Sequence, residues 1–234
     1  MKKKLLMVLF VSMMTFTLAA CKGNSGSAAQ QSNTETASKN SATAVKGSES
    51  KKILIVYFSR VGNTDFGDDV DTIASESIRV EDEKITGNTE VIANMINKSV
   101  GGDVFEITTV ENYPIKYRDT TDFAKQEQES NARPELSAHV EGMENYDVVF
   151  LGYPNWWGTI PMPVYTFLEE YDFSGKSIVP FATHEGSGLG SSARDIEKLS
   201  PNSNILDGLE VRGSDVTDAQ SDVENWLKEN KMTE

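Results

Sequence analysis

The stretch Ile-Leu-Ile-Val-Tyr-Phe-Ser-Arg-Val-Gly-Asn-Thr, residues 53–64, is the most informative about the type of fold. Its first six residues are apolar or aromatic without interruption, which is typical of a central strand that helices cover on both faces. The next six residues, Ser59 to Thr64, are mostly small or polar. At a strand-to-helix turn, such residues can direct backbone amides, hydroxyls and a helix N-terminus at a phosphate. An ordinary polar turn explains these residues equally well when they are taken alone.

Strands and helices alternate along the rest of the chain. Apolar runs predict further strands over residues 148–151 and 178–181, and two more strands are predicted over 103–108 and 205–211. Helices are predicted around residues 91–96 and over 117–131, 161–170, 189–199 and 218–230. This alternation predicts an α/β fold over residues 51–234, with a three-layer, doubly wound, five-stranded parallel sheet. Ligands of such folds bind outside the carboxyl ends of the strands, so the loops there carry the functional question.

The tripeptide Gly-Asn-Thr occurs twice, at residues 62–64 and again at 87–89. The second copy leads directly into a segment with helical spacing, and the first leads into an acidic segment without it. We therefore expect the strand to end at Ser59-Arg60, the helix to open at Asn88-Thr89, and residues 65–86 to form an insertion. Loops of that length are uncommon and usually functional, so we expect a lid over the ligand or a subunit contact.

Two more loops follow predicted strands and contain residues suited to a flat ligand. Residues 152–159 read Gly-Tyr-Pro-Asn-Trp-Trp-Gly-Thr, and residues 183–188 read Thr-His-Glu-Gly-Ser-Gly. Two adjacent tryptophans at a strand end favour a conjugated ring, although one buried and one exposed tryptophan would need no ligand. The glycines allow close approach of the backbone. His184 could donate a hydrogen bond or move a proton, and a solvated loop histidine is equally compatible with the sequence.

Residues 51 to about 226 resemble the flavodoxin-like FMN-binding family, in particular its NAD(P)H-quinone oxidoreductase-like branch. The resemblance is carried by Tyr-Phe-Ser-Arg at 57–60 together with the stretches at 153–159 and 183–188. It implies the sheet order 2-1-3-4-5, FMN as the cofactor and redox chemistry at the flavin. The family's phosphate loop is interrupted here, which leaves open which Gly-Asn-Thr copy serves.

The resemblance also implies roles for individual residues. Ser59, Arg60, Asn88 and Thr89 would hold the phosphate, with Asn63 as a further candidate; Pro154, Asn155, Trp156, Trp157 and Gly158 would line the isoalloxazine, and Thr183, His184, Glu185, Gly186, Ser187 and Gly188 would hold its other edge. His184, Trp157 and Tyr117 are the catalytic candidates, although a structural role for Tyr117 is favoured.

The N-terminal residues have the pattern of a targeting segment. Residues 1–20 combine three lysines with an apolar run too short for a membrane span, which indicates a signal peptide. Leu-Ala-Ala-Cys at 18–21 resembles the lipobox of bacterial lipoproteins, which implies cleavage before Cys21 and its lipidation. Residues 21–50 are polar and small, and predict a disordered tether. The expected location is therefore extracytoplasmic, anchored by lipid to the bacterial cell membrane.

Charge limits the partners. The chain has 22 basic and 36 acidic residues, a formal net charge of −14, which disfavours binding of nucleic acid. Three function classes stay open: an FMN-dependent enzyme that passes electrons from NAD(P)H or another donor to a quinone or small acceptor, an electron carrier that docks to a redox protein, and a binding lipoprotein that has lost FMN. No metal site is expected, and a homodimer is a further possibility.

Overall fold

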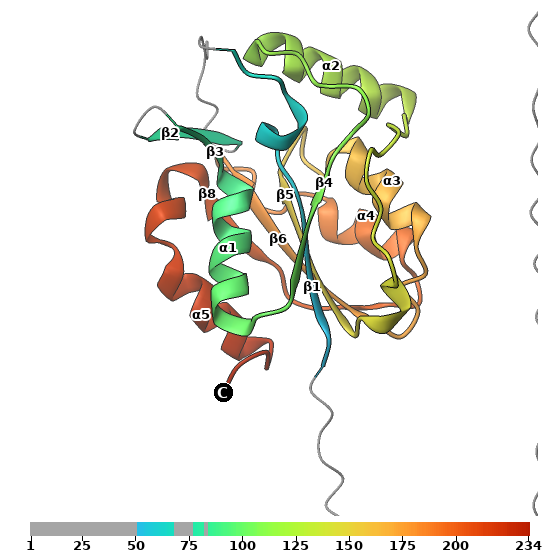
Figure 1. Ribbon diagram of the computed structural model, residues 1–234, viewed down its shortest axis with the longest axis vertical. Coiled ribbons are helices and arrows are strands. Elements are labelled where there is room, and N and C mark those ends of the chain that lie inside the picture. The colour runs from blue at the N-terminus through green and yellow to red at the C-terminus, as the bar shows by residue number, and fades with distance from the viewer. Residues whose placement is uncertain (1–50, 68–76, 82–83) are drawn as a thin grey trace, which may run out of the picture. The chain divides into compact units, whose positions relative to one another are not determined.

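The chain forms a parallel sheet whose order confirms the predicted 2-1-3-4-5 arrangement. The structure, a computed structural model, describes residues 51–67, 77–81 and 84–234 (Figure 1). The strands run β4 (Asp103–Ile107), β1 (Ile53–Phe58), β5 (Val148–Pro154), β6 (Ser177–His184), and the fifth position holds β7 (Asn204–Ile205) and β8 (Leu209–Arg212). All of these pairings are parallel.

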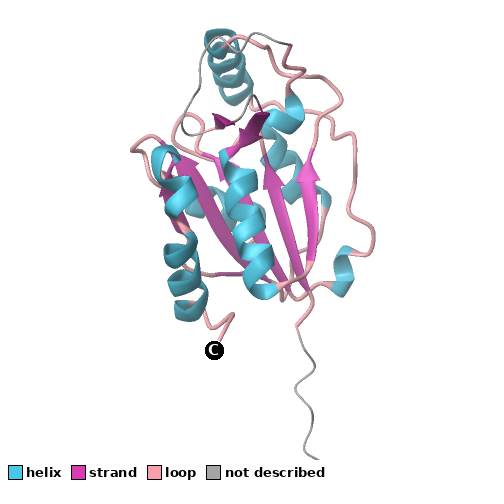
Figure 2. Cartoon of the chain, turned by 60° about the vertical axis from the view of Figure 1, so that its left-hand side comes forward, coloured by secondary structure: helices cyan, strands magenta, loops and turns pink. Residues whose placement is uncertain are grey.

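Helices cover both faces of the sheet (Figure 2). On one face, Ile55 and Tyr57 of β1 pack with side chains of α1 (Asn88–Val100) and α5 (Gln220–Glu229). On the other face, Leu54, Val56 and Phe58 pack with α3 (Met162–Glu170) and α4 (Ser192–Leu199). The alternation along β1 therefore buries both faces of the strand, as its unbroken apolar run predicts.

The fifth strand differs from the prediction of one strand over 205–211. In the structure this segment is divided into β7, which pairs with the residues of β6 before Pro180, and β8, which pairs with those after it. Proline lacks an N–H to donate, so the neighbouring strand cannot pair without interruption. Gly208 lies in the break, where a side chain would press against Leu189 and Pro180.

Several helix limits were predicted to within a few residues. The helix expected over 117–131 is α2 (Tyr117–Ser130), and the one expected over 189–199 begins later, at Ser192. The final helix is preceded by a 3₁₀ segment, η3 (Gly213–Asp218), that the sequence did not indicate. Figure 1 shows α2 lying beyond the carboxyl ends of the strands, so that it borders the expected ligand site.

The predicted insertion contains regular structure. A 3₁₀ turn, η1 (Val61–Asn63), follows β1, and an antiparallel pair, β2 (Ile78–Glu81) and β3 (Lys84–Gly87), leads into α1. The helix begins at Asn88, as expected. The signal peptide, Cys21, the tether and residues 68–76 and 82–83 of the insertion lie outside the described residues. Within the described ranges, no helix has the length and apolarity to cross a membrane.

Candidate functional site

A cavity of about 370 Å³ opens at the carboxyl ends of the strands. It is bordered by the end of β1, the insertion, α2 and the loops after β5 and β6. The lining residues are Arg60, Ser77, Tyr117, Thr120, Thr121, Ala124, Asn155, Trp156, Trp157, Glu185 and Ser187. Seven of these eleven are sequence-predicted site residues, so the structure brings together residues from three separate predicted loops.

The two tryptophans occupy different environments in a tight turn. The backbone groups of Trp156 and Thr159 bond to each other in both directions, at 3.1 and 3.2 Å. Both central residues have positive φ, 54° at Trp157 and 84° at Gly158. A bulky residue rarely adopts this conformation, and such strain persists mainly at functional sites. Trp157 remains 50% exposed and lines the cavity. The strained turn therefore places an exposed aromatic ring at the cavity.

Contacts with neighbouring elements fix both indole rings. Trp156 packs edge-on against Phe58 and Tyr113, and its Nε1 donates to Ser77 Oγ at 3.2 Å. Trp157 Nε1 donates to the carbonyl of Thr121 in α2 at 3.0 Å. The cavity therefore has two aromatic walls whose orientations are set by the insertion and by α2.

Asn155 ties the loop after β5 to the loop after β6. Its side-chain Nδ2 donates to the carbonyl of Gly188 at 2.6 Å, and its Oδ1 accepts from the Gly158 amide at 3.0 Å. The Ser191 amide donates to the Gly158 carbonyl at 2.8 Å, and a side chain at Gly190 would collide with that same carbonyl. The two loops predicted to hold the ring therefore form one connected unit.

A second group of predicted residues gathers at the N-terminus of α1. Ser59, Asn88, Thr89 and Thr183 are all buried there. Thr89 Oγ1 lies 3.0 Å from Thr183 Oγ1, and a side chain at position 87 would collide with Ser59 Oγ. Hydroxyls, an amide side chain and the N–H groups of a helix start are donors that suit a phosphate, although the backbone amide of Asn88 here donates to the carbonyl of Ser77 at 2.9 Å.

The side-chain amide of Asn63, in the first Gly-Asn-Thr copy, bonds to backbone at the ends of β1 and β4 and does not line the cavity. Its Nδ2 donates to the carbonyls of Ser59 and Ile107 at 2.8 and 2.9 Å. Its Oδ1 accepts from the amide and hydroxyl of Thr109 at 2.7 and 3.0 Å. All the hydrogen-bonding positions of the amide are used within the fold. The first copy thus joins β1 to β4, and the second copy opens the helix.

The other predicted residues divide between loop backbone and neighbouring strands. Pro154, Gly158, Gly186 and Gly188 shape the two loops and do not line the cavity. His184 is buried at the end of β6, where its Nδ1 accepts from the Gly186 amide at 2.8 Å. Its Nε2 lies 4.0 Å from a carboxylate oxygen of Glu210. The imidazole is directed toward β8, and its catalytic role stays a prediction.

Two glutamates near the site have raised pKa values. Burial and the neighbouring Glu90 raise the pKa of Glu106 to about 7, although a hydrogen bond from Tyr57 acts to lower this pKa. The carboxylate of Glu106 fills the space that a side chain at Gly62 would need. Burial likewise raises the pKa of Glu127 to about 7, although Tyr113 donates to it at 2.8 Å. Both carboxyls therefore change charge near neutral pH.

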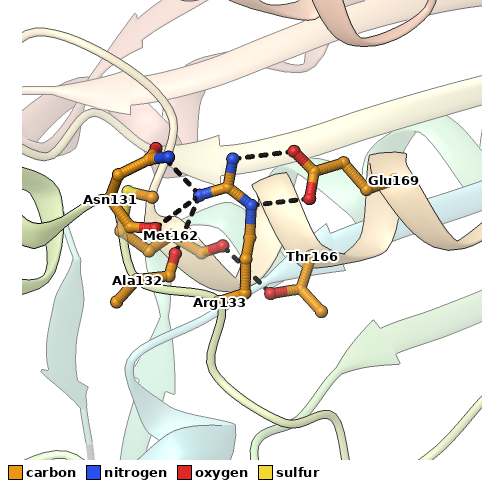
Figure 3. Close-up of polar contacts among 6 residues, drawn as sticks. All are labelled: Asn131, Ala132, Arg133, Met162, Thr166 and Glu169. Carbon is orange, nitrogen blue, oxygen red and sulfur yellow. Dashed lines mark hydrogen bonds and ion pairs between the residues drawn. The ribbon is translucent and has the colours of Figure 1, made fainter.

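A bidentate ion pair fixes the end of α2 to α3 (Figure 3). Arg133 donates to both carboxylate oxygens of Glu169 at 2.7 Å, and its NH1 bonds to the carbonyls of Asn131 and Ala132. This hydrogen bonding lowers the pKa of Glu169. One wall of the cavity is therefore anchored to the body of the domain at its C-terminal end.

Four of the lining residues were not among the sequence-predicted site residues, although the insertion was expected near the ligand and Tyr117 was a candidate. Ser77 lines the cavity from the insertion, and Thr120, Thr121 and Ala124 line it from α2. The available signal was the composition of α2, which buries only Thr120, Ala124 and Glu127. A helix with small and polar buried residues has no apolar stripe for a core, and here it borders a cavity.

Comparisons with known proteins agree with this geometry. A flavodoxin family model matches residues 78–230. A Bacteroides eggerthii DSM 20697 protein described as a flavoprotein is 28% identical, with a TM-score of 0.58 over 76% of this chain and 96% of that one. A Lactobacillus acidophilus NCFM flavoprotein is 21% identical, with a TM-score of 0.50 over 73% and 99%. No curated protein sequence matches. Because the family model covers more than half of the residues, the chain belongs to the flavodoxin family.

Proposed function

We propose that the protein is an FMN-dependent oxidoreductase that passes electrons from NAD(P)H or another donor to a quinone or another small acceptor. The observation that carries this proposal is the cavity, which the two tryptophans of the loop after β5 line together with Tyr117 and other residues of α2. Membership of the flavodoxin family supplies FMN as the cofactor. The structure of the Lactobacillus acidophilus flavoprotein, which has a related fold, was solved in complex with FMN, and this supports the same assignment.

The residues present fit FMN at both of its ends. The buried hydroxyl and amide side chains at the start of α1 suit the phosphate, and the aromatic walls suit the isoalloxazine. FMN supplies the electron transfer when bound. The chain's own residues orient the ring through Asn155 and the two loops that it joins, and α2 restricts the access of water.

The spectrum of the domain from Lys51 onward, with added FMN, tests this function. Flavin bands that stay with the protein through gel filtration would support it, and steady turnover with NAD(P)H and a quinone would favour the enzyme. Failure to retain flavin in excess FMN would contradict it and favour the binding lipoprotein that has lost its cofactor.

An electron carrier that docks to a redox partner is the second candidate. Its support is the acidic domain, since residues 51–234 carry 16 basic and 34 acidic side chains. Reduction of a partner protein that is faster than reduction of any small quinone would favour the carrier over the enzyme.

We also propose that the protein is anchored outside the cytoplasm by lipid on Cys21. The support is the lipobox-like run before the single cysteine. The variant Cys21→Ser should move the protein from the membrane fraction to the soluble fraction, because a stable anchor needs its acyl chains. A variant that stays in the membrane fraction would contradict the anchor.

A further inference from the structure

Arg60 was expected to hold the phosphate, but its side chain extends in another direction. Arg60 is 1% exposed, and its NH2 donates to the carbonyl of Ile115 at 2.7 Å. The guanidinium carbon lies 5.1 Å from the ring centroid of Phe66 and 5.9 Å from that of Tyr117. All three of these partners lie outside α1, which begins at Asn88. The contacts with Ile115, Phe66 and Tyr117 place the guanidinium beside α2 and the insertion.

The cavity and the start of α1 are lined by different residues. Arg60 shares the cavity with Tyr117, Trp156 and Trp157. Asn88, Thr89 and Thr183, which gather at the start of α1, do not line it. A ligand with a phosphate at the helix and a ring between the loops would meet Arg60 at its ring end.

The charge of Arg60 has a specific consequence at that end. A guanidinium with little solvent access interacts more strongly with a nearby charge than exposed side chains do. Among the residues that the structure describes, Glu185 is the acidic one that lines the cavity, and it is exposed, so solvent screens it. The buried cation should therefore outweigh the nearby anion, even though the domain as a whole is acidic.

We propose that Arg60 acts on the isoalloxazine end of the site, where its guanidinium stabilises the negative charge that the ring gains on reduction, and that it does not hold the phosphate. This inference rests on the proposed binding of FMN. It assigns to Arg60 a part in setting the redox potential, and it leaves the phosphate to the start of α1.

Paired affinities for FMN and riboflavin test this assignment, because riboflavin has the ring but lacks the phosphate. The full-length apoprotein and its variants Arg60→Gln and Arg60→Lys are titrated with both flavins. We expect Arg60→Gln to weaken both by a similar factor, about tenfold, so that the ratio of the two affinities stays as in the wild type. A variant that loses affinity for FMN alone would overturn the proposal.

The midpoint potential of bound FMN, measured by dithionite titration, is the second readout. Loss of the charge should weaken binding of the reduced ring more than that of the oxidised ring. A tenfold difference between them would lower the potential by about 30 mV for a two-electron couple. Arg60→Lys keeps the charge and should lie between Arg60→Gln and the wild type. An unchanged potential in Arg60→Gln would overturn the proposal.

Matched variants separate this effect from others. Arg118→Gln removes an exposed charge next to Tyr117 in α2 and should leave the affinities and the potential unchanged. Glu185→Gln should shift the potential weakly in the positive direction. If Arg60→Gln does not fold, the affinity ratio in Arg60→Lys decides in the same way. Wild-type protein that binds neither flavin would contradict the proposed function itself.

Discussion

At the scale of single residues, identical side chains in the same tripeptide have different structural roles. The two copies of Gly-Asn-Thr illustrate this, because the side-chain amide of Asn63 donates to the carbonyls of Ser59 and Ile107, whereas Asn88 begins α1. The sequence left open which copy serves the ligand. The bond between Asn63 and Thr109 spans 46 residues, and contacts over such a separation are not visible in a local pattern.

Replacing Trp157 by glycine should separate ligand binding from stability. Glycine adopts positive φ without strain, which offsets the lost bond to Thr121, so the free energy of unfolding should change by less than about 1 kcal/mol. Affinity for FMN should fall about tenfold, since an aromatic wall is lost. Titration with FMN and urea unfolding measure the two effects. Lys125→Ala, which removes the cation 5.2 Å above the ring, should keep the affinity. Unchanged affinity in the glycine variant would contradict the role of Trp157.

Glu127 should make stability depend on pH in a predictable direction. Because burial raises its folded pKa from 4.5 to about 7, the folded state binds the proton more tightly. Its stabilising contribution is complete below pH 4.5 and is lost as the pH rises through about 7. At about pH 8, Glu127→Gln should therefore be more stable than the wild type by about 1–2 kcal/mol, after allowance for solvent screening.

Urea unfolding near pH 5 and near pH 8 measures this difference. The advantage of the glutamine variant should vanish at the lower pH, because the glutamate is then protonated and still accepts from Tyr113. Glu129→Gln, on the same helix but exposed, should leave the pH profile of stability unchanged. A constant difference across the two pH values would show that the carboxyl does not titrate in this range.

At the scale of elements, the sequence predicted the sheet, most helices and an insertion near the ligand, but not which residues of the insertion and which other residues of α2 line the cavity. Apolar runs located β1, β5 and β6, because strands buried on both faces leave a local signature. The segment of β4 is mixed, Asp-Val-Phe-Glu-Ile, because this strand lies at the edge of the sheet and is partly exposed. The break between β7 and β8 depends on Pro180 in the adjacent strand, so it follows from pairing that local patterns do not contain. Ser77 likewise reaches Trp156 across 79 residues.

Deletion of residues 62–86 would test the insertion, because it joins Val61 to the second Gly-Asn-Thr and restores a continuous loop. The variant loses Phe66 beside Arg60 and Ser77 from the cavity wall. It also loses Asn63, whose position in the joined sequence Asn88 takes. We expect FMN binding to persist and the range of acceptors or the oligomeric state to change, as measured by steady-state kinetics and by mass in solution. Unchanged kinetics and mass would contradict a lid or a subunit contact. Ser77→Ala, which removes only the bond to Trp156, shows how much of the effect belongs to that residue.

At the scale of the whole molecule, charge should govern which acceptors react fastest. Residues 51–234, which include the folded domain, carry 16 basic and 34 acidic side chains, a formal net charge of −18. Such a field attracts cations and repels anions over distances near the Debye length, about 10 Å at 0.1 M salt. The buried guanidinium of Arg60 acts only within the cavity and does not cancel this long-range effect.

Reduced holoprotein should therefore transfer electrons faster to a cationic acceptor than to an anionic acceptor of similar potential. Raising the ionic strength from about 0.01 M to about 1 M shortens the Debye length roughly tenfold, so the first rate should fall and the second should rise. Stopped-flow oxidation by a basic redox protein, by ferricyanide and by a neutral quinone makes the comparison, with the neutral quinone as the control that salt leaves unchanged. Equal salt dependence for all three would mean that the acidic surface does not face the route by which electrons leave, and it would remove the main support for docking to a basic partner.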